Sequence, residues 1–276
     1  MKITSVTAIN VKSLKIQSDN SALVTYYYPL EASEYQNSCN DYFVTLGTAT
    51  TGYIYVALRI DESSSDGDEL TFTATDASGN EYKGTKSAPG SGFKNGKYYY
   101  NTSAIALTKQ AARVAPTITW NNGSAVSPDE VYHYYDVYAT EITLSGTSSG
   151  YRFWMNNGGT IHINGLTATY DDDNHSFIYS DGNLTLDVSG ANSITTKNHY
   201  QTIFADGTLK LSGSGTLTVT ANYADRYGIL ADSNYNDENN SNASALAASG
   251  YTVTRSDVTD NGAGTYSWTY TVAPTE

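Results

Sequence analysis

The sequence predicts an all-β protein with an N-terminal β-sandwich at residues 1–113, followed by a short right-handed parallel β-helix and a C-terminal hairpin at residues 114–276. Three observations predict this fold class. Only 16% of residues are charged, so most of the polar character of the chain comes from Thr, Ser, Asn and Gly. This composition favours strands and turns over helices. Apolar residues alternate with a period of two in the first part. The second part repeats itself about every 25 residues.

Charge marks the boundary between the two parts. Residues 1–113 hold 10 Lys or Arg and 11 Asp or Glu, a net charge of −1, whereas residues 114–276 hold 5 and 17, a net charge of −12. A short linker is expected at residues 109–116, because Pro116 cannot donate to a strand ladder. The two parts are therefore expected to be separate domains.

Charge and composition also exclude several classes of protein. A net charge of −13 argues against a nucleic-acid partner, which needs clustered Lys and Arg. No stretch reaches the roughly 18 apolar residues of a transmembrane helix. Cys39 is the single cysteine, which excludes an internal disulfide and a cysteine-based metal cluster.

The first residues and the composition bear on where the protein is located in or outside the cell. Residues 1–6 alternate like a strand and lack the apolar core of a signal peptide. The composition, with 25 Tyr against 6 Phe and few Lys, is typical of a surface protein. We therefore expect an extracellular or outer-surface location, with the signal sequence absent from this chain.

The strands of the first part follow from its apolar pattern. Residues 3–11 and 23–27 alternate apolar with polar side chains, which indicates strands with one buried face. The denser apolar runs at residues 42–46 and 53–60 are expected to be central strands.

A hairpin and a final strand complete the first part. Residues 70–75 and 81–85 flank a turn-rich segment at residues 76–80 that contains Gly79, which predicts a hairpin. A last strand is expected at residues 97–107. Some seven strands in about 110 residues are typical of a β-sandwich.

Three of these segments carry a resemblance to a known family. Residues 53–60, 70–82 and 93–100 resemble, in this order, the strand, the hairpin and the final "GKxY" strand of bacterial fimbrillin-like proteins. The likeness covers about residues 1–110 and implies one sandwich domain of a surface or fimbrial protein. The lipid-anchoring cysteine expected of precursors in that family is not found in the sequence.

The repeat is the strongest pattern in the chain. Residues 178–186 align with residues 203–211 at an offset of 25, and the alignment continues because Gly190 falls on Gly215 and Ile194 on Val219. Looser copies begin at Phe153 and at Gly228.

A unit this short cannot bury its own apolar face, so it must stack on its neighbours. We expect Ile178, Ile203 and Ile229 to form one inward ladder of about four coils, each rising about 4.8 Å. The usual crossover rule makes the helix right-handed. An antiparallel sandwich or barrel is the alternative. A hairpin about an Asn261-Gly262 turn is expected to cap the open end.

This half also resembles a known class of module. Residues 208–213 and 215–220 are similar to the "GTLTVTG"-like coils of the β-helical "carbohydrate-binding domain" modules of bacterial surface proteins. The resemblance implies sugar binding, although the motif itself describes coil geometry.

The same half offers little evidence of catalysis or metal binding. The sequence contains no Gly-x-Ser-x-Gly elbow, no HExxH and no phosphate loop, and its few basic residues do not adjoin a carboxylate run as lyase chemistry requires. Asp171, Asp172 and Asp173 form a weak candidate for Ca²⁺, for which a solvated loop is the favoured interpretation. His175 and His199 lie about one coil apart but lack a third ligand. We expect no cofactor and no catalytic residues.

Aromatic residues at the start of the second part are the candidate ligand-binding site. In a strand about half of such side chains point outward, where their rings can stack on apolar sugar faces. Cross-strand aromatic pairing or packing between domains is the alternative. The candidate residues are Tyr132, Tyr134, Tyr135, Tyr151 and Trp154.

These observations favour a non-enzymatic bacterial cell-surface protein, an adhesin or fimbrial component. The expected partner is a host or bacterial surface glycan or protein, together with other fimbrial subunits. The alternative is a glycan-binding or glycan-cleaving β-helix protein similar to polysaccharide lyases. A flat strip of Tyr residues would favour binding, and a cleft with paired carboxylates about 5–10 Å apart would favour cleavage.

Overall fold

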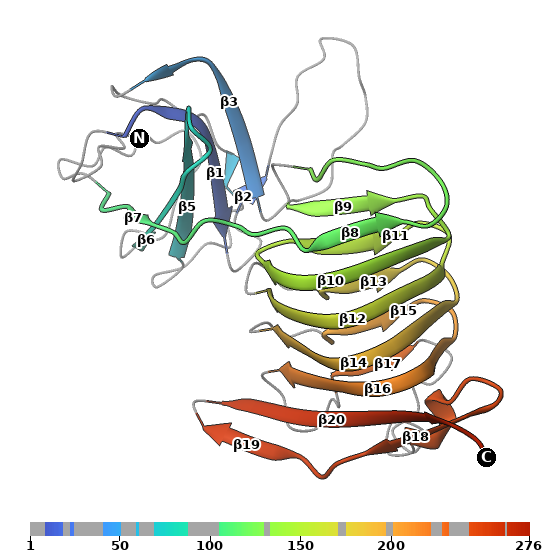
Figure 1. The fold of residues 1–276 in the computed structure, drawn as a ribbon. Helices are drawn as coiled ribbons and strands as arrows, with labels where there is room; N and C mark the ends of the chain where they lie inside the picture. The colour runs from blue at the N-terminus through green and yellow to red at the C-terminus, as the bar shows by residue number, and fades with distance from the viewer. Residues whose placement is uncertain are drawn as a thin grey trace. The chain divides into compact units, whose positions relative to one another are not determined.

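The protein is all-β and contains several sheets, among them sheets of parallel strands (Figure 1). The computed structural model describes residues 9–18, 23–24, 41–50, 59–60, 69–87, 105–129, 133–170, 175–196, 201–221, 228–231, 243–262 and 264–276. The chain divides into two compact units, residues 1–112 and 113–276.

Unit 1 is built on an antiparallel sheet with the strand order β3-β1-β5-β6-β7. A second pair, β2 with β4, is also antiparallel. The strands are β1 (Val11–Ser18), β2 (Leu23–Val24), β3 (Asp41–Thr50), β4 (Arg59–Ile60), β5 (Glu69–Asp76), β6 (Glu81–Ser87) and β7 (Thr108–Lys109).

The predicted hairpin is confirmed as β5 and β6, with Thr75 opposite Glu81. The Asp76 carboxylate organises the turn, because it accepts hydrogen bonds from the backbone N–H groups of Ser78 (2.8 Å) and Asn80 (2.9 Å). Gly79 takes a positive φ of 82°, which a turn of this kind requires.

The buried side of this sheet joins β1 and β5. Leu14 lies opposite Ala74 and Ile16 opposite Phe72, and all four side chains are fully buried. The segment at residues 42–46 lies in β3, which pairs with β1. The strands expected at residues 3–8, 25–27, 53–58 and 97–104 lie outside the described residues.

Unit 2 consists of two sheets between which the chain alternates (Figure 1). One sheet contains four long parallel strands and the other contains five short parallel strands. The long strands are β10 (Glu141–Ser149), β12 (Gly159–Tyr170), β14 (Leu184–Thr196) and β16 (Leu209–Ala221). The short strands are β9 (Tyr134–Val137), β11 (Arg152–Met155), β13 (Ile178–Ser180), β15 (Ile203–Ala205) and β17 (Ile229–Ala231).

The register of these sheets confirms the repeat. Ile178 lies beside Ile203, which lies beside Ile229, and each of the three is at most 2% exposed. Gly190 pairs with Gly215, as the 25-residue offset predicted. The copies pair in parallel, so the antiparallel alternative is wrong for this part of the chain.

The long strands bend at glycines. Gly146, Gly165 and Gly190 have φ between 62° and 75°, a conformation that side chains disfavour. Beside this bend, Asn192 is buried between Leu166 and Leu217. Its Oδ1 accepts a hydrogen bond from the backbone N–H of Leu166 (2.9 Å), and its Nδ2 donates to the carbonyl oxygens of Ser189 (2.9 Å) and Thr216 (3.2 Å). The amide thereby links three consecutive long strands.

Antiparallel strands complete the long-strand sheet at both ends. β8 (Thr117–Trp120) pairs with β10, and β20 (Thr265–Pro274) pairs with β16. β18 (Tyr251–Arg255) and β19 (Thr259–Gly262) pair with β20 in turn, and a 3₁₀ helix, η2 (Ala243–Leu246), precedes them.

The C-terminal strands explain how this edge is covered. Trp268 and Tyr270 of β20 are buried against β16, so the strand provides apolar packing as well as hydrogen bonds. The expected hairpin turn is displaced, because Gly262 pairs with Thr265 and the chain therefore reverses between these two residues and not at Asn261-Gly262.

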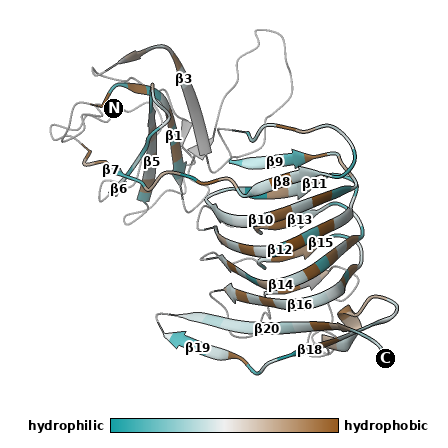
Figure 2. Ribbon diagram, viewed as in Figure 1, coloured by the Kyte–Doolittle hydropathy of each residue, from teal (hydrophilic) through white to brown (hydrophobic). Residues whose placement is uncertain are grey.

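The core of unit 2 lies between its two sheets. Figure 2 shows hydrophobic and hydrophilic residues alternating along β10, β12, β14 and β16. The inward members form one cluster that extends from Tyr135 to Val272. Since alternate residues of each strand belong to this cluster, the remaining ones face outward and are available to form a surface site.

Candidate functional site

Four aromatic side chains lie next to one another on the outer side of the short-strand sheet. They are Tyr134 of β9, Trp154 of β11, Tyr179 of β13 and Phe204 of β15, and we call them the aromatic strip. Consecutive ring centroids are 5.8, 5.4 and 5.6 Å apart. All four side chains are half-buried, so the rings present surface to solvent.

The strip follows from strand alternation and parallel register. Phe153 and Met155 are fully buried, which directs Trp154 outward. In-register pairing then places Trp154 beside Tyr179 and Tyr179 beside Phe204. Tyr and Trp pairs at such separations add to the stability gained from their burial alone.

Carboxylates lie along the same face and orient the polar edges of the rings. The Trp154 indole Nε1 donates to Asp181 Oδ2 (2.9 Å), and the Tyr179 hydroxyl donates to Asp206 Oδ2 (2.8 Å). Both aspartates come from the repeat that follows the ring they hold. We call Asp181 and Asp206 the carboxylate row.

Asp136 extends the acidic character of this face towards β9. It is the register partner of Trp154 and accepts hydrogen bonds from the Tyr138 hydroxyl (3.1 Å) and from the Asn156 amide. The hydrogen bond to Asp136 raises the pKa of Tyr138, and the negative charge of Asp136 acts in the same direction.

The first ring of the strip has a cationic neighbour. The Arg152 guanidinium carbon lies 5.2 Å from the centroid of the Tyr134 ring, within cation–π range. Burial raises the pKa of Tyr134, the charges of Asp136 and Asp129 raise it further, and Arg152 opposes them. The Tyr134 phenol is therefore neutral at physiological pH.

The candidate residues from the sequence separate into three groups. Tyr134 and Trp154 belong to the strip. Tyr135 does not, because it points into the core, is only 6% exposed and stacks on Phe153 with ring centroids 5.0 Å apart. Tyr151 is half-buried and packs against Tyr135 (5.7 Å between centroids) rather than along the strip. Tyr132 and the candidate calcium residues Asp171, Asp172 and Asp173 lie outside the described residues.

Tyr179, Phe204 and the carboxylate row were missed at the level of sequence. A signal for them was present, because the 25-residue alignment places Tyr179 on Phe204 and Asp181 on Asp206. Once Ile178 and Ile203 are assigned to the inward ladder, their following neighbours must face outward in one column.

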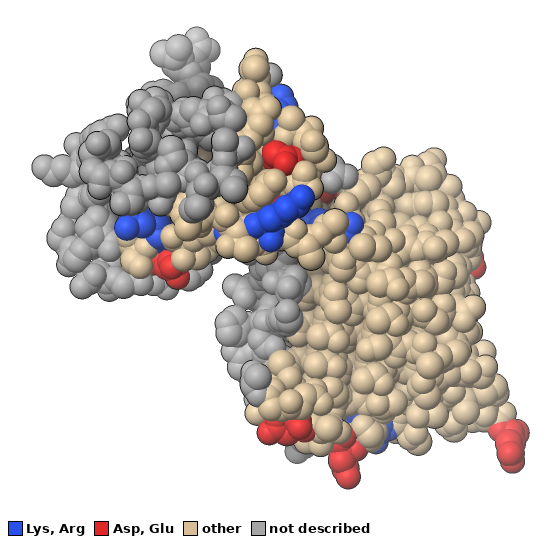
Figure 3. Space-filling model, turned by 60° about the vertical axis from the view of Figure 1, so that its left-hand side comes forward, with Lys and Arg blue, Asp and Glu red and all other residues tan. Residues whose placement is uncertain are grey.

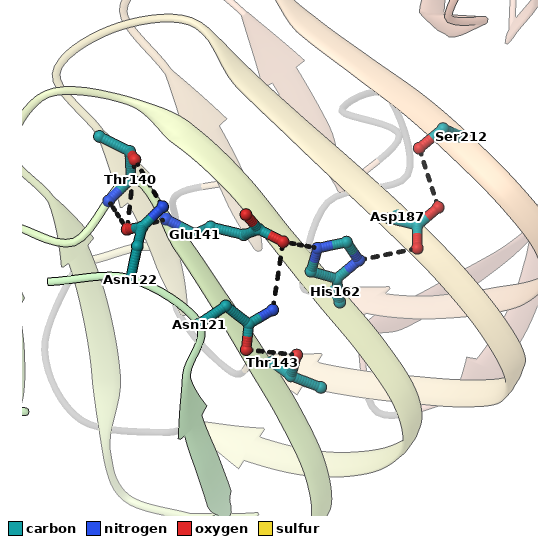
Figure 4. Close-up of polar contacts among 8 residues, drawn as sticks. All are labelled: Asn121, Asn122, Thr140, Glu141, Thr143, His162, Asp187 and Ser212. Atoms are coloured by element: carbon teal, nitrogen blue, oxygen red, sulfur yellow. Dashed lines mark hydrogen bonds and ion pairs between the residues drawn. The ribbon is translucent and has the colours of Figure 1, made fainter.

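A second polar arrangement crosses the outer side of the long-strand sheet (Figure 4). His162 of β12 lies between two carboxylates, with Nε2 at 3.0 Å from Glu141 Oε1 and Nδ1 at 2.8 Å from Asp187 Oδ2. Asn121 donates to Glu141 (3.2 Å) and Ser212 donates to Asp187 (3.0 Å). The chain of contacts thus joins the strands from β10 to β16.

The charges in this arrangement support one another. Partial burial alone would lower the pKa of His162, but the hydrogen bonds to Asp187 and Glu141 and their negative charges raise it. Hydrogen bonds from Asn121 and His162 lower the pKa of Glu141. Ser212 contacts Asp187 and not the imidazole, so the imidazole is not placed to activate the serine as a nucleophile.

The remaining outer surface of the long strands carries hydroxyl groups. Beyond the bend, Thr169, Thr195 and Thr220 occupy one register column, and Thr220 Oγ1 lies 2.8 Å from Ser267 Oγ on β20. Figure 3, in which the left-hand side of Figure 1 comes forward, shows a broad face of this unit almost without charged side chains. We call the outer side of the long strands beyond the bend the face with hydroxyl groups, and it differs in chemistry from the face with the aromatic strip.

Within the described ranges, no group of three or more His, Cys, Asp or Glu side chains is placed to hold a metal ion. In the same part of the chain, no helix has the length and apolar character needed to cross a membrane. Comparisons of the sequence with protein-family models and curated proteins, and of the structure with solved structures, find no match.

Proposed function

We propose that this protein is a non-enzymatic bacterial cell-surface protein of the adhesin or fimbrial class, in which residues 113–276 bind a glycan along the aromatic strip. The observation that carries the proposal is the continuous line of rings formed by Tyr134, Trp154, Tyr179 and Phe204. Exposed aromatic rings stack on the apolar faces of sugars, and adjacent polar groups bind their hydroxyls.

The proposal includes the architecture of the two units. Residues 113–276 are proposed to form a short right-handed parallel β-helix, supported by the alternation of long and short strands in two parallel ladders. Residues 1–112 are proposed to form a fimbrillin-like β-sandwich, supported by the antiparallel sheet with its buried side and by the additional β2–β4 pair.

The same geometry supports binding over cleavage. Glycoside cleavage places a sugar bond or a water molecule between two carboxylates. At the polar arrangement of the long-strand sheet, the space between Glu141 and Asp187 is occupied by the His162 ring, which contacts both. Polysaccharide cleavage is therefore the less supported of the two functions.

The proposed setting is extracellular, with the glycan on a host or bacterial surface. Surface display suits a repeat unit of this kind, because many copies on one cell multiply a modest affinity. Residues 1–112 would serve attachment or assembly with other fimbrial subunits, since exposed edges of antiparallel sheets accept strands from partners.

Binding of the full chain to a glycan array, followed by calorimetry with the glycans retained, tests this proposal. Trp154→Ala and Tyr179→Ala should each weaken binding about 2- to 10-fold, because each removes one stacking surface. Thr195→Ala is the matched control, since it removes a half-buried side chain from the face with hydroxyl groups. Tyr135→Ala is unsuitable because it would open a cavity in the core.

Two results would contradict the proposal. One is the absence of any bound glycan on the array. The other is a glycan whose affinity is unchanged by both strip substitutions and reduced by Thr195→Ala, which would place the site on the other face.

A further inference from the structure

We infer that the glycan bound by the aromatic strip carries free amino groups, that is, a polymer of amino sugars in its cationic form. This inference rests on the proposed function and specifies its ligand class. It comes from the combination of aromatic faces with the carboxylate row on one outer surface.

The first argument is the position of the charges. Asp181 and Asp206 lie at the edges of Trp154 and Tyr179, to which they are hydrogen bonded, and both aspartates are exposed. A carboxylate offers about four lone-pair positions. A single donor from a ring therefore leaves each carboxylate able to accept hydrogen bonds from a ligand.

The second argument is the chemistry of the rings. The face of an indole or phenol attracts a cation, and Trp does so most strongly. An ammonium group that lies over the strip can contact a ring face and a carboxylate oxygen together. A neutral sugar would use the rings and would gain less from the negative charge, while an anionic sugar would be repelled.

The third argument is periodicity. Ring and carboxylate recur together in consecutive repeats, as Trp154 with Asp181 and Tyr179 with Asp206. Adjacent strands are about 4.8 Å apart, so the surface offers the same pair of groups at regular steps. A polymer with an apolar sugar face and an amine in every unit matches this repetition better than a peptide with irregular side chains.

The fourth argument is the field around the strip. Residues 114–276 carry 5 basic against 17 acidic residues, a net charge of −12. Such a charge attracts a polycation over a distance set by the ionic strength. Arg152 lies beside Tyr134, which confines the amine-binding part of the strip to Trp154, Tyr179 and Phe204.

The experiment compares three soluble ligands of equal length with the full chain by calorimetry at mildly acidic pH. The ligands are oligomers of glucosamine, of N-acetylglucosamine and of glucose. The glucosamine oligomer should bind about fivefold to tenfold more tightly than the other two, and added salt should reduce that difference.

Variants without the carboxylate charges separate the contribution of the ligand's amino groups to the binding affinity from the contribution of ring stacking. Asp181→Asn with Asp206→Asn keeps an oxygen acceptor beside each ring and removes both charges. This variant should bind all three oligomers with similar affinity, close to that of the parent chain for the neutral ones. Asp257→Asn, at an exposed position near the C-terminus, removes a charge outside the strip and should leave the preference unchanged.

The outcomes are distinguishable. Equal binding of the three oligomers by the parent chain would overturn this inference and leave the proposed glycan binding intact. Binding of none of them, with no glycan retained on the array, would overturn both. A lysine oligopeptide is titrated as a fourth ligand, and its tighter binding relative to the glucosamine oligomer would overturn the inference in favour of a basic peptide.

Discussion

At the scale of single residues, unit 2 is held together by side chains that reach from one repeat to the next. The Asn183 amide oxygen accepts a hydrogen bond from the backbone N–H of Thr208, 25 residues later (2.8 Å). His162 does the same across the long strands, where it contacts Glu141 and Asp187. A repeat fold thus gains polar links between its repeats as well as apolar packing.

His162 gives this unit a predictable dependence on pH. Because its folded pKa is raised, its contribution to stability is fully present below the unfolded pKa of about 6.5 and is lost as the pH rises through the folded pKa. His162→Gln should therefore lower the melting temperature by about 1 to 3 °C at about pH 5.5, and by less at about pH 9.

Tryptophan fluorescence during thermal unfolding measures this effect, because Trp120, Trp154 and Trp268 all belong to unit 2. Glu141→Gln is the companion variant. The pKa of Glu141 is lowered, so its contribution is present above the unfolded pKa and is lost as the pH falls through the folded one. An equal effect of His162→Gln at both pH values would show that the carboxylates do not stabilise the imidazolium.

At the scale of strands, register is decided by the inward columns. A shift by one residue would move every inward apolar side chain of a strand to the solvent face. The column of Ile178, Ile203 and Ile229 specifies the register of the short strands. Asn192 adds specificity in the long strands, since its amide bonds fit only the present alignment of Leu166 and Thr216.

Ile203→Asp tests the inward column. The substitution places an unpaired charge between two buried isoleucines and should destabilise unit 2 by more than about 3 kcal/mol. Denaturant unfolding followed by tryptophan fluorescence measures the change.

Thr185→Asp is the control, because Thr185 faces outward on β14 beside Lys210 and should change stability by less than about 0.5 kcal/mol. Equal stability of Ile203→Asp and the parent chain would refute the stacked column.

At the scale of the whole molecule, the chain divides into two compact units. The apolar cluster from Tyr135 to Val272 lies entirely within residues 113–276, and the antiparallel strands β8 and β20 cover the two edge strands of its long-strand sheet. A closed interior and covered edges are what an independently folding unit needs.

A fragment of residues 113–276 should therefore unfold in one cooperative transition, with a melting temperature within a few degrees of the fluorescence transition of the full chain. It should also retain the glycan binding of the full chain, since the strip lies within it. Binding that follows residues 1–112 instead would assign recognition to the first unit and leave the second as a spacer.

The sequence alone determined the repeat, the parallel register of its best copies and the hairpin at Asp76. These features depend on short-range periodicity, in which like residues recur at constant spacing and pair with one another. The turn chemistry of Asp76 and Gly79 is likewise local.

The tertiary structure decided which side chains lie on the outer surface of unit 2. Tyr134 and Tyr135 are adjacent residues of the same type, but Tyr135 is buried in the core, where it stacks on Phe153, and Tyr134 is half-buried on the outer side. The segment around β9 has no clear copy of the repeat, so the sequence did not show which of its residues face inward. The aromatic strip and the His162 contacts exist because strands more than 20 residues apart in sequence pair in register. Periodicity encodes which residues can pair, but packing of the core selects which side of each strand becomes the binding surface.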